Sequence, residues 1–515
     1  MLPEFRNEPF TDFSKPENRA AMEAAIEKVH GELGKRYPIV IDGEHILEGD
    51  TFKSYNPARK DEVIGEFTKG TKEMALRAVD VAHERFEEWR KVDPNERARY
   101  LIRAAAILRR RKFEFAAWQV VEVSKNWAEA DGDVAEAIDF LEFYGREMMR
   151  ISEPQPVVPY PGEENELYYV PLGVSVVIPP WNFPGAIMIG MTTAAVVTGN
   201  TVILKPASTA PTVAWKFFEI LEEIMLPAGV VNFLPGPGSA IGDTIVDHPK
   251  TRLIAFTGSK EIGLRISNRA AQVNDGQIWI KRTILEMGGK DFILVDETAD
   301  IEAAADGIVA AAYGFQGQKC SACSRAIIHE SIYDELVAKV VERSKKIKVG
   351  EPDHMASGMG AVIDQWAYEN ILGYIETGKK ENRLVLGGNK AGDGGWFIEP
   401  TIFADVDGND TIAQEEIFGP VLACIKCSSF EDGIKIANST EFGLTGALFS
   451  SDRRRLEIGR RDLHCGNLYL NRKCTGALVG VQPFGGFNMS GTDSKAGGRD
   501  YLLLFTQGKS VTEKF

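Results

Sequence analysis

The chain is 515 residues long, enough for about three domains of roughly 150 residues each. Its composition, 44% hydrophobic and 26% charged, is that of an ordinary globular protein. The formal net charge of −15 argues against nucleic acid or an anionic membrane as the main partner. The N-terminal sequence has no secretory signal pattern, and six cysteines are too few for a disulfide scaffold. We therefore expect a cytoplasmic protein.

Helical spacing of apolar residues dominates the first 150 residues. The predicted helices cover residues 17–34, 72–92, 96–125 and 128–150, and short strands are predicted at 37–46 and 61–67.

The stretch 167–204 contains no charged residue and is long enough to span a bilayer. Its prolines and a Gly-Asn pair would, however, leave backbone groups unsatisfied in lipid. We interpret it instead as a strand at 174–178, a helix at 186–197 and a strand at 201–204, which together form a βαβ unit.

Strand–helix alternation continues with a helix at 213–224 and short strands at 230–234 and 253–256. The pattern from 173 to 287 predicts a parallel, doubly wound sheet with ligands at the carboxyl ends of its strands. A second alternating region follows from 288 to 480. Its predicted strands are 292–295, 326–329, 421–426 and 447–450, and its predicted helices are 301–314, 331–347, 364–378, 430–439 and 452–462.

Two extended segments lie outside this alternation. Residues 152–171 are rich in proline, which breaks any helix, and residues 501–512 have strand character. We expect these segments to form a small third sheet that pairs with another subunit.

Two glycine-studded segments carry the clearest chemistry. Glu286 lies in LEMGGKD, and Cys320 follows 34 residues later in FQGQKCSACSR. A thiol can form a covalent acyl intermediate and a carboxylate can act as a base, so the pair indicates chemistry at a carbonyl carbon. No histidine lies beside Cys320, which makes Glu286 the candidate base. A helix predicted to start near Ser321 would lower the pKa of the thiol through its dipole.

The C-x-x-C pattern of Cys320 and Cys323 has two other interpretations, a zinc site and a redox pair. A second C-x-x-C lies about 100 residues away, far beyond the ~15–20 residues of a compact zinc ribbon. We expect no metal. The other cysteines are interpreted as small buried hydrophobic residues, namely Cys323, Cys424, Cys427, Cys465 and Cys474.

A dinucleotide site is indicated less directly, because the chain has no G-x-G-x-x-G. The motif FTGSKEIG (256–263) follows a predicted strand and opens a helix. There Gly258 permits a tight turn, and Ser259 can cap the helix or bind a phosphate oxygen. A purely structural capped turn would have the same sequence.

Taken in order along the chain, these motifs resemble the landmarks of the aldehyde dehydrogenase superfamily. They are PWNFP (180–184), ILKPAS (203–208), FTGSKEIG (256–263), LEMGGKD (285–291), GQKCSACSR (317–325), EEIFGP (415–420) and PFGGFNMSG (483–491). The resemblance covers about residues 30–515 and implies an α/β fold. It implies three parts, which are a Rossmann-type NAD(P)-binding domain (1–151 and 172–287), an α/β catalytic domain (288–481) and a small β oligomerisation arm (152–171 and 482–515). A homodimer or a dimer-based higher homo-oligomer is implied as well.

The same resemblance implies the roles of the site residues. Cys320 attacks the aldehyde, Asn182 and the Cys320 backbone N–H bind the resulting oxyanion, and Glu286 activates the water that hydrolyses the thioester. The implied cofactor residues are Lys205, Ser208, Gly258, Ser259, Gly288, Glu416 and Phe418. Because Ser208 stands where many NAD-specific relatives carry Glu, we predict NAD as the main cofactor with NADP tolerated.

Three further segments, RNEPFTDFS (6–14), TGALVG (475–480) and GTDSKAGGRDYL (491–502), resemble the subgroup that oxidises L-glutamate γ-semialdehyde in proline degradation. In that subgroup Ser321, Gly476 and Ala477 would hold the substrate carboxylate, and Lys319 would add positive charge. A helix cap, a turn and a solvated charge are the structural alternatives. A different semialdehyde, a cofactor-independent thiol hydrolase or acyltransferase, and a catalytically silent protein on this fold remain open as functions.

Overall fold

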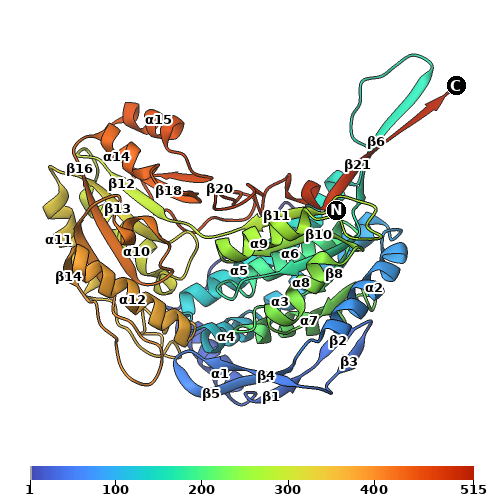
Figure 1. The fold of residues 1–515 in the computed structure, drawn as a ribbon, viewed down its shortest axis with the longest axis horizontal. Coiled ribbons are helices and arrows are strands. Elements are labelled where there is room, and N and C mark those ends of the chain that lie inside the picture. Colours follow the sequence, from blue (N-terminus) through green and yellow to red (C-terminus); the bar gives the residue numbers. More distant parts are fainter. Residues whose placement is uncertain (1–2) are drawn as a thin grey trace.

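The computed structural model describes residues 3–515, and within them two seven-stranded sheets form the framework. The two large sheets lie on opposite sides of the molecule in Figure 1. The expected α/β fold is confirmed, with one large sheet in each predicted alternating region.

The first large sheet has a parallel centre, as the sequence predicts. Its strands in spatial order are β11 (Arg282–Glu286), β10 (Thr251–Thr257), β7 (Val174–Ile178), β8 (Thr201–Leu204), β9 (Val231–Phe233), β2 (Ile39–Ile41) and β3 (Glu44–Ile46). The antiparallel pairings of this sheet are those of β2 with β3 and of β2 with β9. The helices of this part are α2 (Lys72–Trp89), α6 (Ala186–Val197), α7 (Pro211–Glu223), α8 (Gly238–Asp247) and α9 (Lys260–Ala270). Its central strands are mostly apolar because helices cover both faces of a parallel sheet.

A helical layer from the first 151 residues packs on α6 and α7 of this part. It consists of α1 (Pro16–His30), α3 (Pro94–Arg110), α4 (Lys112–Val123) and α5 (Trp127–Ile151). The single helix predicted over 96–125 is wrong, because the backbone leaves the helical region at Arg111 and divides it into α3 and α4. Beside this layer lies a three-stranded sheet of β1 (Lys35–Tyr37), β5 (Arg59–Thr68) and β4 (Thr51–Asn56), of which β4 was not predicted.

The second large sheet has one antiparallel edge strand, β14. Its spatial order is β14 (Arg383–Leu386), β15 (Thr401–Val406), β16 (Val421–Cys427), β13 (Cys323–His329), β12 (Asp291–Val295), β18 (Thr445–Phe449) and β19 (Asn467–Leu470). Its helices are α10 (Ile301–Tyr313), α11 (Tyr333–Ser344), α12 (Gln365–Glu381), α13 (Thr411–Gln414), α14 (Phe430–Ala437) and α15 (Arg453–Asp462). A two-residue pairing of β17 (Phe442–Gly443) with β20 (Phe487–Asn488) lies next to it.

The two extended segments do pair with each other. Strands β6 (Glu163–Pro171) and β21 (Thr506–Lys514) form an antiparallel arm that projects from the body and carries the C-terminus at its tip (Figure 1). The strand predicted to begin at 501 is wrong at its start. Residues Tyr501–Phe505 form the 3₁₀ helix η2, because Tyr501, Leu502 and Phe505 are all buried, a spacing that the alternating faces of a strand do not provide.

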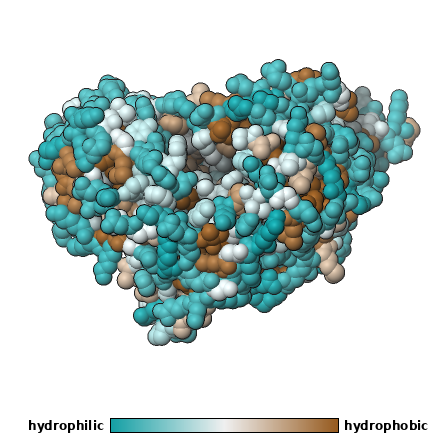
Figure 2. Space-filling model, turned by 60° about the horizontal axis from the view of Figure 1, so that its bottom comes forward, coloured by the Kyte–Doolittle hydropathy of each residue, from teal (hydrophilic) through white to brown (hydrophobic). Residues whose placement is uncertain are grey.

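The uncharged stretch 167–204 forms the end of β6, then β7, α6 and β8. Among residues 3–515 no helix is both long and apolar enough to cross a bilayer. Hydrophilic residues cover most of the face shown in Figure 2, and hydrophobic residues form separate patches among them.

Candidate active site

Four neighbouring strands of the first sheet bring predicted site residues to one edge. Asn182 follows β7, Lys205 follows β8, Gly258 follows β10, and Glu286 is the last residue of β11. These four strands are adjacent and parallel, so their carboxyl ends meet. This is the edge at which doubly wound sheets bind ligands.

The second sheet contributes the edge that is formed by the amino ends of its strands. Cys320 precedes β13 and Glu416 precedes β16, and these two strands are neighbours. Two hydrogen bonds join the edges of the two sheets. Asn182 Nδ2 donates to the Gln318 carbonyl over 3.0 Å, and the Gly289 N–H donates to Glu416 Oε1 over 2.9 Å. Cys320 therefore faces the strand ends that carry Asn182 and Glu286.

The helix predicted to begin near Ser321 is wrong. Cys320 lies in a turn, and β13 starts three residues later. The turn is preceded by three left-handed residues, Phe315 (φ 49°), Gln316 (φ 58°) and Gly317 (φ 67°). Such a conformation costs roughly 1–2 kcal/mol for each non-glycine residue, so other contacts must hold the turn.

Those contacts come from distant parts of the chain. The buried Gln316 amide donates to the carbonyls of Ser124 (2.9 Å) and Ala361 (2.8 Å). At Gly317 a Cβ atom would lie 2.2 Å from the Gly419 carbonyl oxygen, so no larger residue fits. Tertiary packing, and not a helix, therefore fixes the backbone that carries Cys320.

The predicted lowering of the Cys320 thiol pKa is wrong as well. Burial raises the pKa of the Cys320 thiol well above its ordinary value, and the negative charges of Asp291, Glu416 and Glu286 raise it further. A hydrogen bond involving the Ser321 backbone lowers it only in part. The thiol is therefore protonated at neutral pH, so the attack requires a proton acceptor.

Glu286 has the properties of that acceptor. Burial raises its pKa to about 7, although hydrogen bonds to Ser494 and Gly486 act in the opposite direction. Ser494 Oγ donates to Glu286 Oε1 over 2.6 Å, and the Gly486 N–H donates to Oε2 over 3.2 Å. A carboxylate whose pKa lies near the working pH is well suited to general base catalysis.

One cavity connects these groups. It has a volume of about 580 Å³ and is lined by both Glu286 and Cys320. All four predicted substrate residues line the same cavity, namely Lys319, Ser321, Gly476 and Ala477. Asn182 is buried beside it and uses one of its two side-chain N–H groups on Gln318, which leaves the other N–H available to an oxyanion.

The structure adds charged residues that the sequence did not indicate. Lys319 is not a solvated charge, because its Nζ lies 2.6 Å from Glu129 Oε2, on α5. Lys473 and Arg472 also line the cavity, and Arg472 donates to the carbonyls of Thr475 (2.8 Å) and Gly476 (3.0 Å). Glu129 and Lys319 are 190 residues apart, and no local sequence signal links them.

The predicted adenosine-side cofactor residues are Lys205, Ser208 and Ser259, whose polar groups make few contacts within the protein. Lys205 is buried, burial lowers its pKa to about 8, and its Nζ contacts the Pro206 carbonyl over 3.3 Å. Ser208 donates to the Gly236 carbonyl over 3.3 Å. Ser259 caps α9 and is exposed, so its hydroxyl is accessible to a phosphate. An ammonium, a hydroxyl and a helix N-terminus are suitable donors for ribose and phosphate oxygens.

The predicted nicotinamide-side residues are Gly288, Glu416 and Phe418, and the absence of a side chain at Gly288 makes room for Glu416. A Cβ atom on Gly288 would lie 2.1 Å from Glu416 Oε2, so only glycine leaves room for that carboxylate. Burial raises the pKa of Glu416 to about 7. Phe418 has a left-handed backbone (φ 56°), and its ring centroid lies 5.5 Å from that of Trp181. The predicted cofactor residues thus fit a dinucleotide.

The remaining cysteines are free and buried, as predicted; they are Cys323, Cys424, Cys427, Cys465 and Cys474. Within residues 3–515 no group of three or more His, Cys, Asp or Glu side chains is placed to hold a metal ion.

Comparison with known proteins identifies the family. The model of the aldehyde dehydrogenase family matches residues 46–511. The chain belongs to the aldehyde dehydrogenase family. It is 58% identical to the 1-pyrroline-5-carboxylate dehydrogenase of Geobacillus thermodenitrificans, over the full length of both chains. The structure of 1-pyrroline-5-carboxylate dehydrogenase from Thermus with bound NAD is 50% identical, with a TM-score of 0.98 and full coverage of both chains. Betaine aldehyde dehydrogenase from Staphylococcus aureus in complex with NAD⁺ is 28% identical, with a TM-score of 0.89, covering 96% of this chain and 97% of its own.

Proposed function

We propose that this aldehyde dehydrogenase oxidises L-glutamate γ-semialdehyde, which is in equilibrium with 1-pyrroline-5-carboxylate, to L-glutamate with NAD in proline degradation. The observation that carries the proposal is the cavity itself. It joins Cys320 and Glu286 to charged groups of both signs, Lys319, Lys473 and Glu129. Full-length relatives at 58% identity bear the corresponding name.

The first chemical step belongs to Cys320. Its proton passes to a base, for which Glu286 is suited, and Sγ forms a bond to the aldehyde carbon. The carbonyl oxygen becomes an oxyanion, which the free N–H of Asn182 and the Cys320 backbone N–H stabilise. Loss of one such donor typically costs ~10²–10³ in rate.

NAD, when bound, supplies the hydride acceptor that turns the thiohemiacetal into a thioester. Lys205 would hold the adenosine ribose, Ser259 a phosphate, and Glu416 the nicotinamide ribose, with Phe418 beside the ring. Glu286 passes the first proton to solvent and then removes a proton from water, whose oxygen attacks the thioester carbon. The C–S bond breaks, L-glutamate leaves, and Cys320 is regenerated.

The amino-acid end of the substrate is a zwitterion and needs partners of both signs. We propose that Ser321 and the backbone of Gly476 and Ala477 bind its carboxylate, while Glu129 faces its ammonium group and Lys319 balances the charge. The left-handed backbone of Gly476 (φ 80°) supports such a role, because it shapes an exposed turn within the cavity wall.

We also propose that two chains associate through the arm, which exposes Val158, Tyr160 and Phe515. Large exposed apolar side chains on a projecting sheet favour a protein partner. The division into cofactor domain, catalytic domain and arm at the predicted boundaries is part of this proposal. Six free thiols fit a reducing compartment, which supports the cytoplasm.

A substrate panel tests the assignment. NADH absorbance is followed with glutamate semialdehyde, succinate semialdehyde and acetaldehyde, each with NAD and with NADP. We expect the highest kcat/KM with glutamate semialdehyde and NAD. NADP should still support turnover, at a lower rate than NAD, because Ser208 does not repel a 2′-phosphate. Turnover only with the other aldehydes would contradict the substrate, and no turnover with millimolar NADP would contradict the cofactor tolerance.

A further inference from the structure

Residues 3–13, hereafter the N-terminal strap, have neither helix nor strand, yet polar contacts hold them against α5. The Glu8 N–H donates to Asp139 Oδ1 over 2.7 Å, and the Thr11 N–H donates to Asp131 Oδ2 over 2.7 Å. Asp131 and Asp139 are only 2% and 3% exposed. Without the strap these carboxylates would lose hydrogen-bond donors in a buried site, which is costly. The strap is therefore a fixed part of the fold.

Asn7 connects the strap to the cavity wall. Its Nδ2 donates to Asp139 Oδ2 over 2.8 Å and to the Val479 carbonyl over 2.9 Å. Val479 belongs to the segment 475–480, whose Gly476 and Ala477 line the cavity. One amide thus uses both of its N–H groups to hold that segment against α5.

Apolar packing reinforces this connection. The rings of Phe5 and Phe143 meet edge to face with centroids 5.2 Å apart. A Cβ atom on Gly480 would lie 3.3 Å from the Phe5 ring and 3.1 Å from the Phe143 ring. The end of the segment 475–480 is therefore packed against the strap as well as hydrogen-bonded to it.

The strap also lines the cavity directly. Phe10 and Thr11 both contribute to its wall, together with Ala128 and Gly132 of α5. Phe10 is 63% exposed, which is unusual for a large aromatic residue that does not contact a partner. A ligand that filled the cavity would cover part of this ring.

The strap lies outside the region that the whole family shares. The family model begins at residue 46, whereas the relative at 58% identity aligns over all 515 residues, strap included. An element that is added to a common catalytic framework and reaches the substrate cavity is suited to selecting the substrate.

We propose that the N-terminal strap determines substrate specificity, with Asn7 positioning the segment 475–480 and Phe10 limiting the length of the aldehyde. This inference rests on the proposed function. In this arrangement Cys320, Asn182 and Glu286 perform the same chemistry on any aldehyde that enters, and the strap favours a short aldehyde that ends in an amino-acid group.

The test compares three aldehydes, namely glutamate semialdehyde, propanal and hexanal, in the full-length enzyme with NAD. For Asn7→Ala we expect KM for glutamate semialdehyde to rise about tenfold with kcat within about twofold, and both constants for propanal to stay unchanged, because only binding of the amino-acid end is lost. For Phe10→Ala we expect kcat/KM for hexanal to rise about tenfold, because the cavity gains room for several methylene groups.

Matched controls are Asn438→Ala, whose amide holds a loop by donating to the Asp462 carbonyl, and Trp366→Ala, an aromatic residue that is 75% exposed and does not line the cavity. Neither should change selectivity. Equal changes for all three aldehydes, or none, would overturn the inference. Thermal unfolding of each variant detects a folding defect in Asn7→Ala, and the exposed Phe10 can be replaced without opening the core. A wild-type enzyme that oxidises propanal and hexanal but not glutamate semialdehyde would contradict the proposed function, while the hexanal comparison would still test the strap.

Discussion

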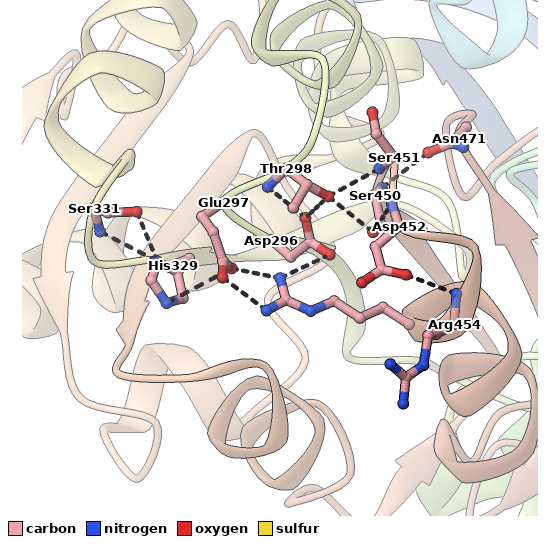
Figure 3. A network of polar contacts seen from close by, with 11 residues as sticks. Asp296, Glu297, Thr298, His329, Ser331, Ser450, Ser451, Asp452, Arg454 and Asn471 are labelled. Carbon is pink, nitrogen blue, oxygen red and sulfur yellow. Dashed lines mark hydrogen bonds and ion pairs between the residues drawn. The ribbon is translucent and has the colours of Figure 1, made fainter.

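Charged side chains have different surroundings at the two edges of the second sheet. At the carboxyl edge, Arg455 of α15 lies 2.6 Å from Glu297 and 3.4 Å from the buried Asp296. His329, at the end of β13, approaches Glu297 (Figure 3). The hydrogen bond from Arg455 lowers the pKa of Glu297 to about 2. Glu297 therefore stays ionised at neutral pH, and its pairing with Arg455 stabilises the fold.

Glu416 at the amino edge, and Glu286, which ends β11 of the first sheet and faces this edge, are instead held by hydrogen bonds from backbone N–H groups and a serine hydroxyl. Burial raises the pKa values of Glu286 and Glu416 to about 7, and that of the Cys320 thiol rises well above its ordinary value. A buried carboxyl without a compensating charge has a pKa raised toward neutral pH, so it can exchange protons during a reaction. Comparing the two edges therefore separates residues that hold the protein together from residues that react.

The largest expected effect is that of Cys320→Ala. We expect activity to fall by at least ~10³-fold, because Cys320 is the one thiol among the residues that line the cavity. The control is Cys427→Ala at the carboxyl edge, a buried free thiol that should leave kcat within about twofold. Steady-state NADH formation measures both. NAD binding by Cys320→Ala, followed by fluorescence, should persist, and its loss would mean that the substitution disturbs more than the nucleophile.

Glu286→Gln should slow steady-state turnover by about 10²–10⁴-fold, since the amide cannot accept a proton from water. A burst of NADH in the first turnover should remain if Cys320 can still lose its proton to solvent. Because the pKa of Glu286 is about 7 and the base acts when ionised, wild-type kcat should fall as pH drops below 7. This decrease, the acidic limb of the kcat profile, should be absent in Glu286→Gln. If the decrease persists in the variant, another group causes it.

A smaller change is expected for Ser494→Ala, which removes the 2.6 Å hydrogen bond to Glu286. This bond lowers the carboxyl pKa, so its loss raises that pKa further. The acidic limb of the kcat profile should move upward by up to about one pH unit, with activity near pH 9 nearly unchanged. Ser490→Ala is the control, because its hydroxyl accepts from the Gly443 N–H instead. An unshifted limb would mean that Ser494 does not influence the base.

The smallest effect on activity is expected at the opposite edge. Arg455→Ala should leave kcat within about twofold but lower the free energy of unfolding by about 1–3 kcal/mol, because Asp296 is buried and its cationic partner is lost. The pKa of Glu297 is lowered in the folded state, so its stabilisation is present above about pH 4.5 and disappears as pH falls toward 2.

Urea unfolding of the wild-type protein and of Arg455→Ala at pH 7 and pH 3 measures the loss in free energy of unfolding. That loss should be smaller at pH 3. The control Arg461→Ala removes an exposed arginine that pairs with its neighbour Asp462, and should change stability little. A loss of activity in Arg455→Ala at unchanged stability would contradict the division between the two edges.

Local sequence predicted the elements whose signals are local. The bounds of β7, α6 and β8 agree with the prediction residue by residue, since each is an apolar run bounded by proline, glycine or asparagine. The family motifs placed Asn182, Glu286 and Cys320 in one site, and the two sheets do bring the ends of their strands together. Parallel sheet topology makes this step dependable, because it sends the loops after neighbouring strands to the same edge.

The misassigned features depend on contacts between distant residues. A helix near Ser321 is locally reasonable, but Gly419 and the two hydrogen bonds of Gln316 impose a left-handed turn. The break between α3 and α4 at Arg111 also has no proline or glycine to mark it. The partnership of Lys319 with Glu129 joins two elements that the sequence does not relate.

By itself, then, the sequence determined the α/β framework and the family, and it predicted the nucleophile and the base, because these reside in residue types and their order. Only the tertiary structure decided the protonation state of Cys320, the balance of charge in the cavity and the attachment of the N-terminal strap to its wall. Each of these depends on burial and on charges brought together from distant parts of the chain. The pKa of a thiol is set by the groups that surround it in space, and its neighbours in sequence are only a few of them.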